Sequence, residues 1–586
     1  MLSQFYNEKI NEAIKYLKEK FGAEDCPADS DDYPPITEKI EFASVNKIKI
    51  KGTERTINCI VAFPKTFPDT LPKIYLSKED FKNYYPIPHV DHNRFICTRD
   101  PEVTFLYENN INEGLQYLVS VAEKIINDGI SKRNVKDFDK EFLAYWNDVA
   151  RSLKILSLIS PTDEISRASI IQLPDNSQRY GHFIVAKSIK EAKDWMENLV
   201  IDFDGHSAKE AIYLPLKQGF LPYDINTNND VLDILEREER KLFKALEEYF
   251  NESDSNRVVI FSVPLPEGKA LGAWIHEPWD EKAVQGFRRG KIPLRNRLSK
   301  TGTNVITKLR VERIDRDRLF SRGGTGITQP IKNSSIAIVG CGSIGGAVAV
   351  SLSKSGINNF SLIDNQKIEP ENVARYTCGF LQIGFEKCNA IKTTLKFHFP
   401  NIYCEEKNDD ILDLLQKDES YLNKFNLTIV AIGKHWIERR LNDLQKRGVI
   451  TTPIVYVWLE PYAVAGQILF IHPYQGGCYA CCFDLDSFKY SVASSELEFL
   501  KREAGCQSTF VPYSNIELDH FVNIASKKIL SFIETPPENS ILYTWVGDKF
   551  SFLKMGHSIN PRWVAELDYS VRETKINKEI DCHYCK

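Results

Sequence analysis

Residues 335–364 begin with Ser-Ile-Ala-Ile-Val-Gly-Cys-Gly-Ser-Ile-Gly-Gly and end with Leu-Ile-Asp. The opening apolar run is mostly β-branched, which predicts a strand buried on both faces of a parallel sheet. Gly340, Gly342 and Gly345 follow, and glycines at this spacing let the backbone approach a phosphate at the start of a helix. Asp364 ends a second apolar strand, where an acidic side chain can bind ribose hydroxyls. The stretch therefore predicts a nucleotide-binding site. The protein class in which this glycine motif is most common is the dinucleotide-dependent oxidoreductases.

Length and composition limit what surrounds this site. A chain of 586 residues predicts three or four domains of about 150 residues each. The net charge of −5 argues against nucleic acid as the main partner. No apolar run approaches the roughly 20 residues that cross a bilayer, and the first residues lack a signal-peptide core. We therefore expect a cytoplasmic protein with no membrane partner.

The 13 cysteines are odd in number and unevenly placed, which argues against a disulfide framework. Two Cys-x-x-Cys pairs near the end of the chain supply the four thiolates of a closed tetrahedral zinc site. The predicted Zn²⁺ ligands are Cys478, Cys481, Cys582 and Cys585. Cys482 and His583 adjoin these ligands and are interpreted as bystanders. Four cysteines could be incidental, but two matched pairs favour zinc.

Residues 1–155 form the first predicted domain. Its elements, in chain order, are a helix at 7–21, strands at 39–45, 47–51 and 56–63, a proline-rich crossing at 63–72, a strand at 73–76, and helices at 111–127 and 138–149. A cysteine-bearing stretch, Val-Asp-His-Asn-Arg-Phe-Ile-Cys, lies at 90–97. The order resembles the ubiquitin-conjugating enzyme fold. The resemblance implies an α+β domain whose cysteine forms a thioester.

Cys97 and His89 are the residues to which this resemblance gives a chemical role. The family's His-Pro-Asn triplet reads Ile-Pro-His at residues 87–89, so His89 replaces the family's asparagine. An imidazole N–H could still donate a hydrogen bond to a developing oxyanion. Two other interpretations of Cys97 stay open: a buried core thiol, or a domain that binds without reacting.

Residues 156–320 form a middle domain, interpreted as an α/β linker or docking domain. Helices are predicted at 188–199 and 229–249, and strands at 178–185 and 257–263. Residues 281–322 are dense in arginine and lysine. Such a run is usually a solvated basic surface, although some arginines could reach the phosphates of the nucleotide site. No chemistry is assigned to residues 156–280.

Residues 321–586 form the third predicted domain, which contains the glycine-rich stretch. Asn372, Arg375 and Lys387 follow that stretch and fit a triphosphate better than a dinucleotide, which weakens the oxidoreductase interpretation. The whole pattern resembles the ThiF/MoeB-type adenylating enzymes, whose core is shared with ubiquitin-activating enzymes. The resemblance implies a Rossmann-like domain that uses ATP and Mg²⁺.

The resemblance also implies roles for individual residues. The positions that would contact ATP are Gly340, Gly342, Gly345, Asp364, Asn372, Arg375 and Lys387. Arg375 and Lys387 would offset the charge of the departing pyrophosphate. In the family, an arginine near the N-terminus reaches across a homodimer, and Arg322, or alternatively Arg318, is the nearest match.

One departure concerns magnesium. The family usually places a metal-binding aspartate after the strand predicted here at 427–432, but residues 431–436 read Ala-Ile-Gly-Lys-His-Trp. Either phosphates, water and Asp364 hold the ion, or Lys434 replaces part of its charge.

Cys506 lies shortly before the helix predicted at 517–533, where ubiquitin-activating relatives carry their thioester cysteine. Its small, polar, glycine-flanked neighbourhood suits an exposed nucleophile, and a non-catalytic cysteine is the alternative. Four other cysteines are expected to be packing residues: Cys341, Cys378, Cys388 and Cys404.

A conjugating-type domain followed by an activating-type domain resembles the fused enzymes of bacterial CBASS antiphage operons. The resemblance implies that ATP activates the C-terminal carboxylate of a cGAS/DncV-like nucleotidyltransferase. The acyl group would then pass through thioesters on Cys506 and Cys97 to a target amine. It also implies a homodimer through the adenylation domain. A sulfur-carrier-type adenylating enzyme and a non-catalytic scaffold remain alternatives.

Overall fold

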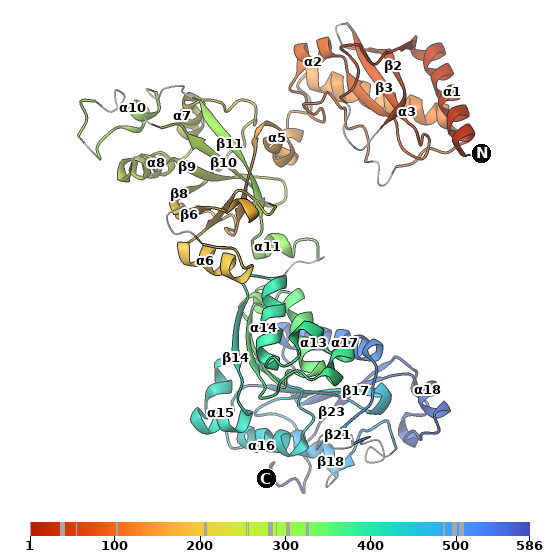
Figure 1. The fold of residues 1–586 in the computed structure, drawn as a ribbon, viewed down its shortest axis with the longest axis vertical. Helices are drawn as coiled ribbons and strands as arrows, with labels where there is room; N and C mark the ends of the chain where they lie inside the picture. The colour runs from red at the N-terminus through yellow and green to blue at the C-terminus, as the bar shows by residue number, and fades with distance from the viewer. Residues whose placement is uncertain are drawn as a thin grey trace. The chain divides into compact units, whose positions relative to one another are not determined.

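The structure is a computed structural model of the 586-residue chain. It describes residues 2–35, 41–53, 55–100, 104–177, 179–203, 208–253, 255, 257–278, 285–288, 290–299, 305–323, 327–484, 487–494, 501–502 and 509–585. The chain divides into two compact units, Met1–Ile189 with Asp204–Ile314 and Lys190–Phe203 with Asp315–Lys586. Figure 1 labels the helices and strands of both units.

The first unit opens with a four-stranded antiparallel sheet. In spatial order its strands are β1 (Glu24–Asp25), β2 (Phe42–Lys51), β3 (Thr56–Pro64) and β4 (Lys73–Leu76). Helices α1 (Leu2–Phe21) and α3 (Ile111–Ile130) pack against β2, and α2 (Lys78–Tyr84) follows β4. Ile10, Ala13 and Leu17 share one buried face of α1, which is why this segment forms a helix with one apolar side.

Two sequence predictions in this region are wrong in detail. The strands expected at 39–45 and 47–51 are one strand, β2, because Asn46 pairs with Val61 of β3 and continues the ladder. The helix expected at 138–149 is two helices, α4 (Asp137–Lys140) and α5 (Phe142–Val149). They are separated by Glu141, whose backbone leaves the helical region with φ −105° and ψ 16°.

The middle region is a closed barrel of seven strands in the order β10-β11-β5-β7-β6-β8-β9. These strands are β5 (Arg151–Ser157), β6 (Ser166–Gln172), β7 (Phe183–Ala186), β8 (Ala208–Pro215), β9 (Val258–Pro264), β10 (Lys269–His276) and β11 (Ile306–Arg313). Parallel pairing of β5 with β11 closes the ring. The sequence indicated an α/β domain here but not a barrel, because closure depends on pairing between distant strands.

Among the described residues, helices α7 (Asn228–Arg237), α8 (Arg240–Glu252) and α10 (Leu294–Ser299) belong to the same unit as the barrel, whereas α6 (Ile189–Asn198) belongs to the second unit from Lys190 onward. The helix predicted at 229–249 is divided into α7 and α8. Glu238 is extended between them, with its carboxylate accepting hydrogen bonds from the N–H groups of Lys217 and Gln218. The basic run at 281–322 is not wholly a solvated surface either. Arg297 and Lys308 are buried, and Lys308 donates to the carbonyl of Pro222 at 2.7 Å.

The second unit contains an eight-stranded sheet in the order β14-β13-β12-β15-β16-β17-β22-β23. Its strands are β12 (Ser335–Val339), β13 (Asn359–Ile363), β14 (Tyr403–Lys407), β15 (Leu427–Val430), β16 (Ile454–Leu459), β17 (Ala465–Ile471), β22 (Ile541–Val546) and β23 (Val571–Lys575). The strands β12–β16 pair in parallel, and β17, β22 and β23 extend the sheet antiparallel. The predicted Rossmann-like domain is therefore confirmed.

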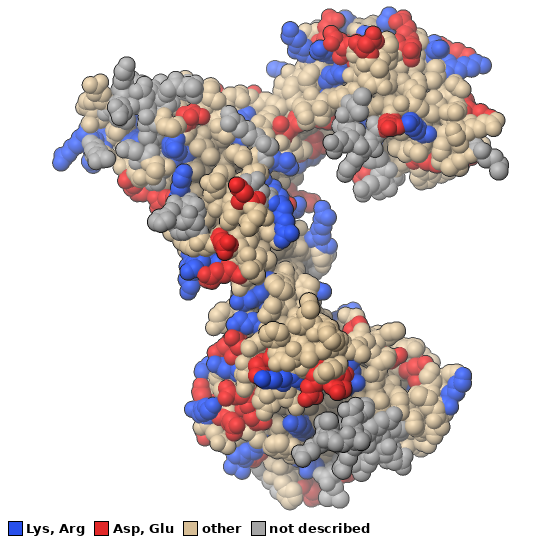
Figure 2. Space-filling model, in the orientation of Figure 1, with Lys and Arg blue, Asp and Glu red and all other residues tan. Residues whose placement is uncertain are grey.

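Helices cover both faces of this sheet. One core cluster contains residues of α13 (Ser343–Lys354), α14 (Lys387–His398) and α17 (Asn515–Glu534), and a second contains residues of α15 (Ile411–Lys417) and α16 (His435–Lys446). Figure 1 shows the two sets on opposite sides of the sheet. In β12, Ile336 and Ile338 enter the first cluster while Ala337 and Val339 enter the second, as expected for a strand buried on both faces. Figure 2 shows acidic and basic side chains interspersed over one face of this unit.

Candidate functional site

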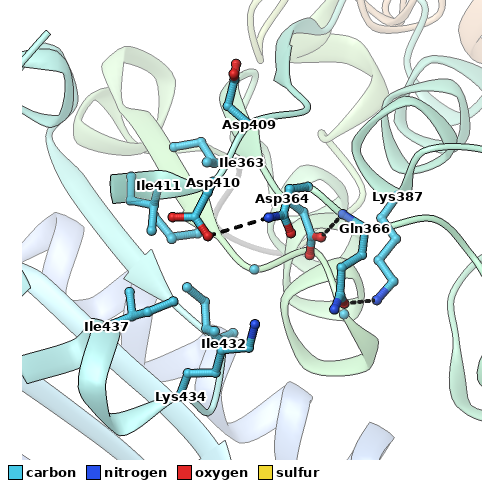
Figure 3. A pocket seen from close by; sticks show the side chains of 15 residues that line it. Ile363, Asp364, Gln366, Lys387, Asp409, Asp410, Ile411, Ile432, Lys434 and Ile437 are labelled. Atoms are coloured by element: carbon cyan, nitrogen blue, oxygen red, sulfur yellow. Dashed lines mark hydrogen bonds between the residues drawn. The ribbon is translucent and has the colours of Figure 1, made fainter. Parts of the chain in front are cut away.

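A pocket lies at the carboxyl ends of β12, β13 and β15 (Figure 3). The helix after β12 covers one face of the sheet and the helix after β15 covers the other, so the strand order reverses at this point. Gly340, Gly342, Asp364 and Lys387, four of the residues predicted to bind a nucleotide, line this pocket. The enclosed space is about 100 Å³. Typical small-molecule sites measure roughly 300–1,000 Å³, so a nucleotide would lie partly outside it.

The glycines of the loop are required by close backbone approaches. A Cβ on Gly345 would lie 1.9 Å from the carbonyl oxygen of Gly340, and one on Gly340 would lie 2.7 Å from that of Ala431. Gly342, by contrast, has no atom within 4 Å of its would-be Cβ. It lines the pocket directly before α13, so a phosphate could approach the backbone and the positive end of the helix dipole there. The loop therefore fits a phosphate-bearing ligand.

Asp364 and Lys387 are both oriented by hydrogen bonds. The carboxylate of Asp364 accepts from the N–H groups of Cys341 and Gln366, each at 2.8 Å. Lys387 is the first residue of α14, and its ammonium donates to the side-chain oxygen of Gln366 at 2.8 Å. Figure 3 shows both side chains beside Gln366, which the sequence analysis did not single out.

Asp409 and Asp410 line the same pocket and were missed from the sequence. They follow β14, and Asp410 caps α15 by accepting from the N–H of Leu412 at 2.9 Å. The available signal was two carboxylates directly after a strand, but only the sheet order brings that strand end beside Asp364. Lys434 also lines the pocket. Carboxylates therefore lie near the place where the usual aspartate after β15 is missing, and oxygen ligands suit Mg²⁺.

Four other predicted nucleotide contacts do not line the pocket: Gly345, which belongs to the same loop, and three residues outside the loop. Asn372 accepts a hydrogen bond from the N–H of Glu369 at 3.0 Å within its own turn. Arg375 lines a separate groove, of about 570 Å³, beside α13 and α17, and its guanidinium lies 5.4 Å from the ring centre of Tyr513. Arg322 is exposed and does not line the pocket. Their roles toward ATP stay predictions.

Cys97 is exposed at a cleft of about 430 Å³ in the first unit. The cleft is also lined by His89, Asp91, Glu141 and Tyr145. Burial raises the pKa of the Cys97 thiol, and the carboxylates of Glu141, Asp100 and Asp91 raise it further. The exposure removes the interpretation of Cys97 as a core thiol. Leu265, which follows β9 of the barrel, reaches the same cleft.

His89 is held by carboxylates on two sides. Its Nδ1 lies 2.9 Å from Glu141, and its Nε2 lies 3.4 Å from Asp137. The hydrogen bond to Glu141 raises the pKa of His89 despite partial burial, which favours the imidazolium form. Both ring nitrogens therefore have partners here. Donation to an oxyanion, as the sequence suggested, would require the ring to leave one of them.

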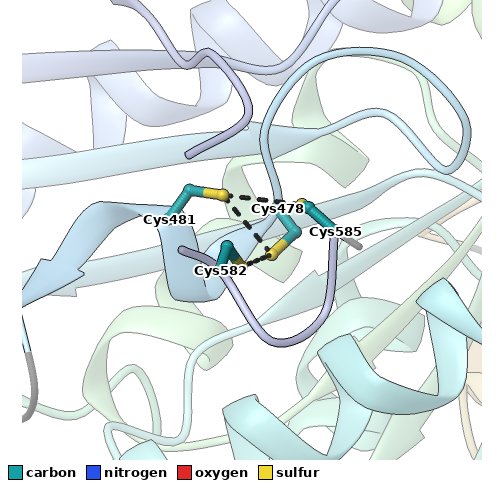
Figure 4. Close-up of side chains that lie close together, drawn as sticks. All are labelled: Cys478, Cys481, Cys582 and Cys585. Carbon is teal, nitrogen blue, oxygen red and sulfur yellow. Dashed lines mark hydrogen bonds between the residues drawn. The ribbon is translucent and has the colours of Figure 1, made fainter. Parts of the chain in front are cut away.

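The two cysteine pairs come together although they are far apart in the sequence (Figure 4). Neighbouring sulfur atoms lie 3.8 Å (Cys478–Cys481), 3.6 Å (Cys478–Cys582) and 3.5 Å (Cys481–Cys585) apart. Four thiolates at the usual Zn–S distance of about 2.3 Å on a tetrahedron would be separated by about 3.8 Å. The cluster therefore fits zinc. Cys482 and His583 are not part of it.

Cys506 lies outside the described residues. The described chain on either side of it is held by the turn that follows β16. Glu460 is buried there and accepts from the N–H groups of residues 492–493, each at 2.9 Å. The N–H of Tyr462 donates to the carbonyl of Pro512 at 2.6 Å. The other four cysteines expected to be packing residues, Cys341, Cys378, Cys388 and Cys404, are all buried.

Two family models match the chain, one over the region of the Cys97 cleft and one over the region of the Asp364 pocket. Residues 37–154 match prokaryotic E2 family B, and residues 314–510 match the ThiF family. The chain thus carries a prokaryotic E2-type domain followed by an E1-like, ThiF-type domain. Among the described residues, none of the helices combines the length and apolar character needed to span a bilayer.

Curated relatives cover parts of the chain. The ATP-dependent ubiquitin transferase-like protein Cap2 of Vibrio cholerae is 27% identical over 242 residues, which is 39% of this chain and 40% of that protein. Cap2 of Pseudomonas aeruginosa is 23% identical over 237 residues, 39% of this chain and 41% of that protein. Ubiquitin-like modifier-activating enzyme 5 of Drosophila grimshawi is 27% identical over 215 residues, 35% of this chain and 52% of that protein. The matches span about half or less of these relatives.

A solved structure of E. coli MccB with ATP is also similar. It shares 19% identity and a TM-score of 0.31, covering 44% of this chain and 68% of that one.

Proposed function

We propose that this chain is an ATP-dependent ubiquitin-transferase-like enzyme, which activates the C-terminal carboxylate of a partner protein and joins it to an amine. One observation carries the proposal: a single chain holds a pocket lined by Asp364 and Lys387 in a ThiF-type domain and an exposed thiol, Cys97, in an E2-type domain. These are the two parts that activation and transfer of an acyl group require.

The chemistry follows from the poor reactivity of a carboxylate, whose leaving group would be oxide. The carboxylate attacks the α-phosphorus of ATP, and the bond to pyrophosphate breaks, which gives an acyl-adenylate. A thiolate at Cys506 then attacks the acyl carbon and AMP leaves. Exchange with Cys97 moves the acyl group to the E2-type domain, where an amine forms the amide and the sulfur takes a proton.

The pocket residues have separate tasks in this scheme. Asp364 would bind the ribose hydroxyls, and Lys387 would offset phosphate charge. Mg²⁺ bound to the phosphates would find oxygen ligands in Asp409 and Asp410, which line the pocket. Arg375, and Arg322 from a second copy of the chain, would act only if nucleotide binding brings them to the site. A homodimer through the ThiF-type domain is therefore part of the proposal.

The partner we propose is a cGAS/DncV-like nucleotidyltransferase, in a CBASS antiphage system of the cytoplasm. Support for this comes from the similarity to the two Cap2 proteins and from the order of the two domains. All described cysteines are free thiols, which agrees with a reducing compartment.

The test is a nonreducing gel of the purified protein with ATP and a candidate nucleotidyltransferase. Wild type should form an ATP-dependent, thiol-sensitive adduct, and Cys97→Ala should accumulate it on Cys506. Cys97→Lys should capture the acyl group as a thiol-resistant amide, located by peptide mapping. A sulfur-carrier-type enzyme would work unchanged with Cys97→Ala, and a scaffold would form no adduct. Charging of Cys97 in Cys506→Ala would refute the two-cysteine relay.

A further inference from the structure

Helix α5 has two faces that belong to different parts of the first unit. Phe142 and Trp146 are buried in a core cluster of the barrel, and the indole N–H of Trp146 donates to the carbonyl of Leu309 in β11 at 2.9 Å. Tyr145 and Asp148, on the same helix, line the Cys97 cleft instead. Helix α5 lies within the residues that match the E2 family, and it connects the Cys97 cleft to the core of the barrel.

Tyr145 of α5 contacts the backbone of His89, which lies beside Cys97. The N–H of His89 donates to the hydroxyl oxygen of Tyr145 at 2.6 Å, and the carbonyl of His89 accepts from the N–H of Cys97 at 2.8 Å. The Tyr145 hydroxyl donates in turn to Glu141 at 2.7 Å, and Glu141 contacts the imidazole of His89. The backbone N–H of His89, the Tyr145 hydroxyl, the Glu141 carboxylate and the His89 imidazole thus form a closed cycle of contacts. This cycle holds His89, whose carbonyl accepts the hydrogen bond from the Cys97 N–H.

The backbone of His89 needs such support. Its φ is +65°, a left-handed conformation that residues other than glycine adopt uncommonly and at some cost. Tyr145 is buried, so its hydroxyl is held in one place. A second contact restrains the same region, because the hydroxyl of Tyr85 donates to Asp148 of α5 at 3.3 Å. The cysteine loop is therefore anchored from outside the four-stranded sheet.

We propose that Tyr145 is a positioning residue for acyl transfer at Cys97, and that the barrel, through α5, is part of the transfer apparatus. The inference rests on the proposed function. Tyr145 acts through the backbone of His89, and its hydroxyl keeps the acylated sulfur in the geometry in which an amine attacks. In that attack the C–N bond forms, the C–S bond breaks, and the Cys97 sulfur keeps the electron pair and takes a proton.

The experiment compares Tyr145→Phe with Tyr249→Phe in the full-length protein. Tyr249 is a matched control, because its buried hydroxyl also donates to backbone, to the carbonyls of Glu210 and Val258, but within the barrel. Hydrogen exchange of the segment that spans residues 89–97 is the first readout. Discharge of Cys97 is the second: Cys97 is charged by exchange with a short peptide thioester, free lysine is added, and peptide mapping follows the Cys97 adduct.

In the Tyr145→Phe protein, the backbone amides of residues 89–97 should exchange their hydrogens faster than in wild type. The acyl group should leave Cys97 for lysine about five- to tenfold more slowly, without a matching loss of Tm. Tyr249→Phe should change neither readout. Unchanged discharge or unchanged exchange in Tyr145→Phe would overturn the proposal, as would equal slowing in both variants. Failure of the proposed function is seen separately, as wild-type protein that discharges a chemically formed thioester but is never charged with ATP.

Discussion

The backbone N–H of Cys341 donates a 2.8 Å hydrogen bond to the carboxylate of Asp364. This bond joins the glycine-rich loop after β12 to Asp364, which follows β13 and lines the pocket. Asp364 therefore shapes the loop, and in the proposed function it would also offer an oxygen to the ribose of ATP.

Asp364→Asn should reduce partner-dependent ATP–pyrophosphate exchange by about 100-fold, because the loop loses a charged acceptor and the ribose loses a carboxylate. Asp413→Asn is the control, since Asp413 is an exposed carboxylate on α15 that does not line the pocket. Exchange at the wild-type rate in Asp364→Asn would remove Asp364 from the site.

The purified protein should contain about one zinc ion per chain by elemental analysis. Cys481→Ser should lose the metal and lower the thermal stability of the second unit, because metal binding contributes to folding. Cys482→Ser, which changes the buried neighbour outside the cluster, should keep the metal. Zinc retained by Cys481→Ser, or absent from wild type, would show that the cysteines serve another purpose.

Tyr479→Phe should destabilise the second unit by about 1–3 kcal/mol. The Tyr479 hydroxyl donates to Glu438 at 2.5 Å, and Glu438 is buried, so the substitution leaves a carboxylate without that donor. Thermal unfolding measures the loss, and Tyr474→Phe, at an exposed position, is the control. Equal melting of the two variants would mean that Glu438 finds another donor.

Glu141→Gln should shift the pH–rate profile of Cys97 alkylation by iodoacetamide to lower pH. Burial raises the pKa of Cys97 and the negative charge of Glu141 raises it further, so removing that charge lowers the pKa. At pH 7.5 a larger fraction of the thiol is then ionised, and alkylation should be about two- to fivefold faster. Glu113→Gln, at an exposed position on α3, should leave the profile unchanged. A shift to higher pH would contradict the electrostatic account.

Local sequence patterns were sufficient to predict the buried strand before the glycine-rich loop and the cluster of four cysteines. The apolar run before Gly340 predicts a strand buried on both faces, and β12 has this character because its side chains enter the cores above and below the sheet. The spacing of the cysteine pairs predicts one metal cluster, and the four sulfur atoms do converge. Both signals work because the residues that carry them are determined by short-range geometry or by ligand chemistry.

Features that depend on which distant segments lie side by side could not be predicted from the sequence. Asp410 reaches the pocket only because β14 lies beside β13, a neighbour relation that spacing does not reveal. Arg375 has the residue type and position of a phosphate ligand, yet it lies over Tyr513 in a different groove. The break at Glu141 was missed as well, because the helical pattern continues through it while its carboxylate is engaged by His89.

Closure of the barrel has a consequence for how partners can be recognised. Among the described residues, each of its seven strands has a neighbouring strand on both sides, at least over part of its length, so the ring has no edge strand that an incoming peptide could extend. A protein that binds this region must therefore be recognised through side-chain contacts, and not by adding a strand to the barrel sheet. The eight-stranded sheet differs, because β14 and β23 end it with one side of each strand unpaired. Of these two architectures, only the open sheet can take up an extended tail as an additional strand.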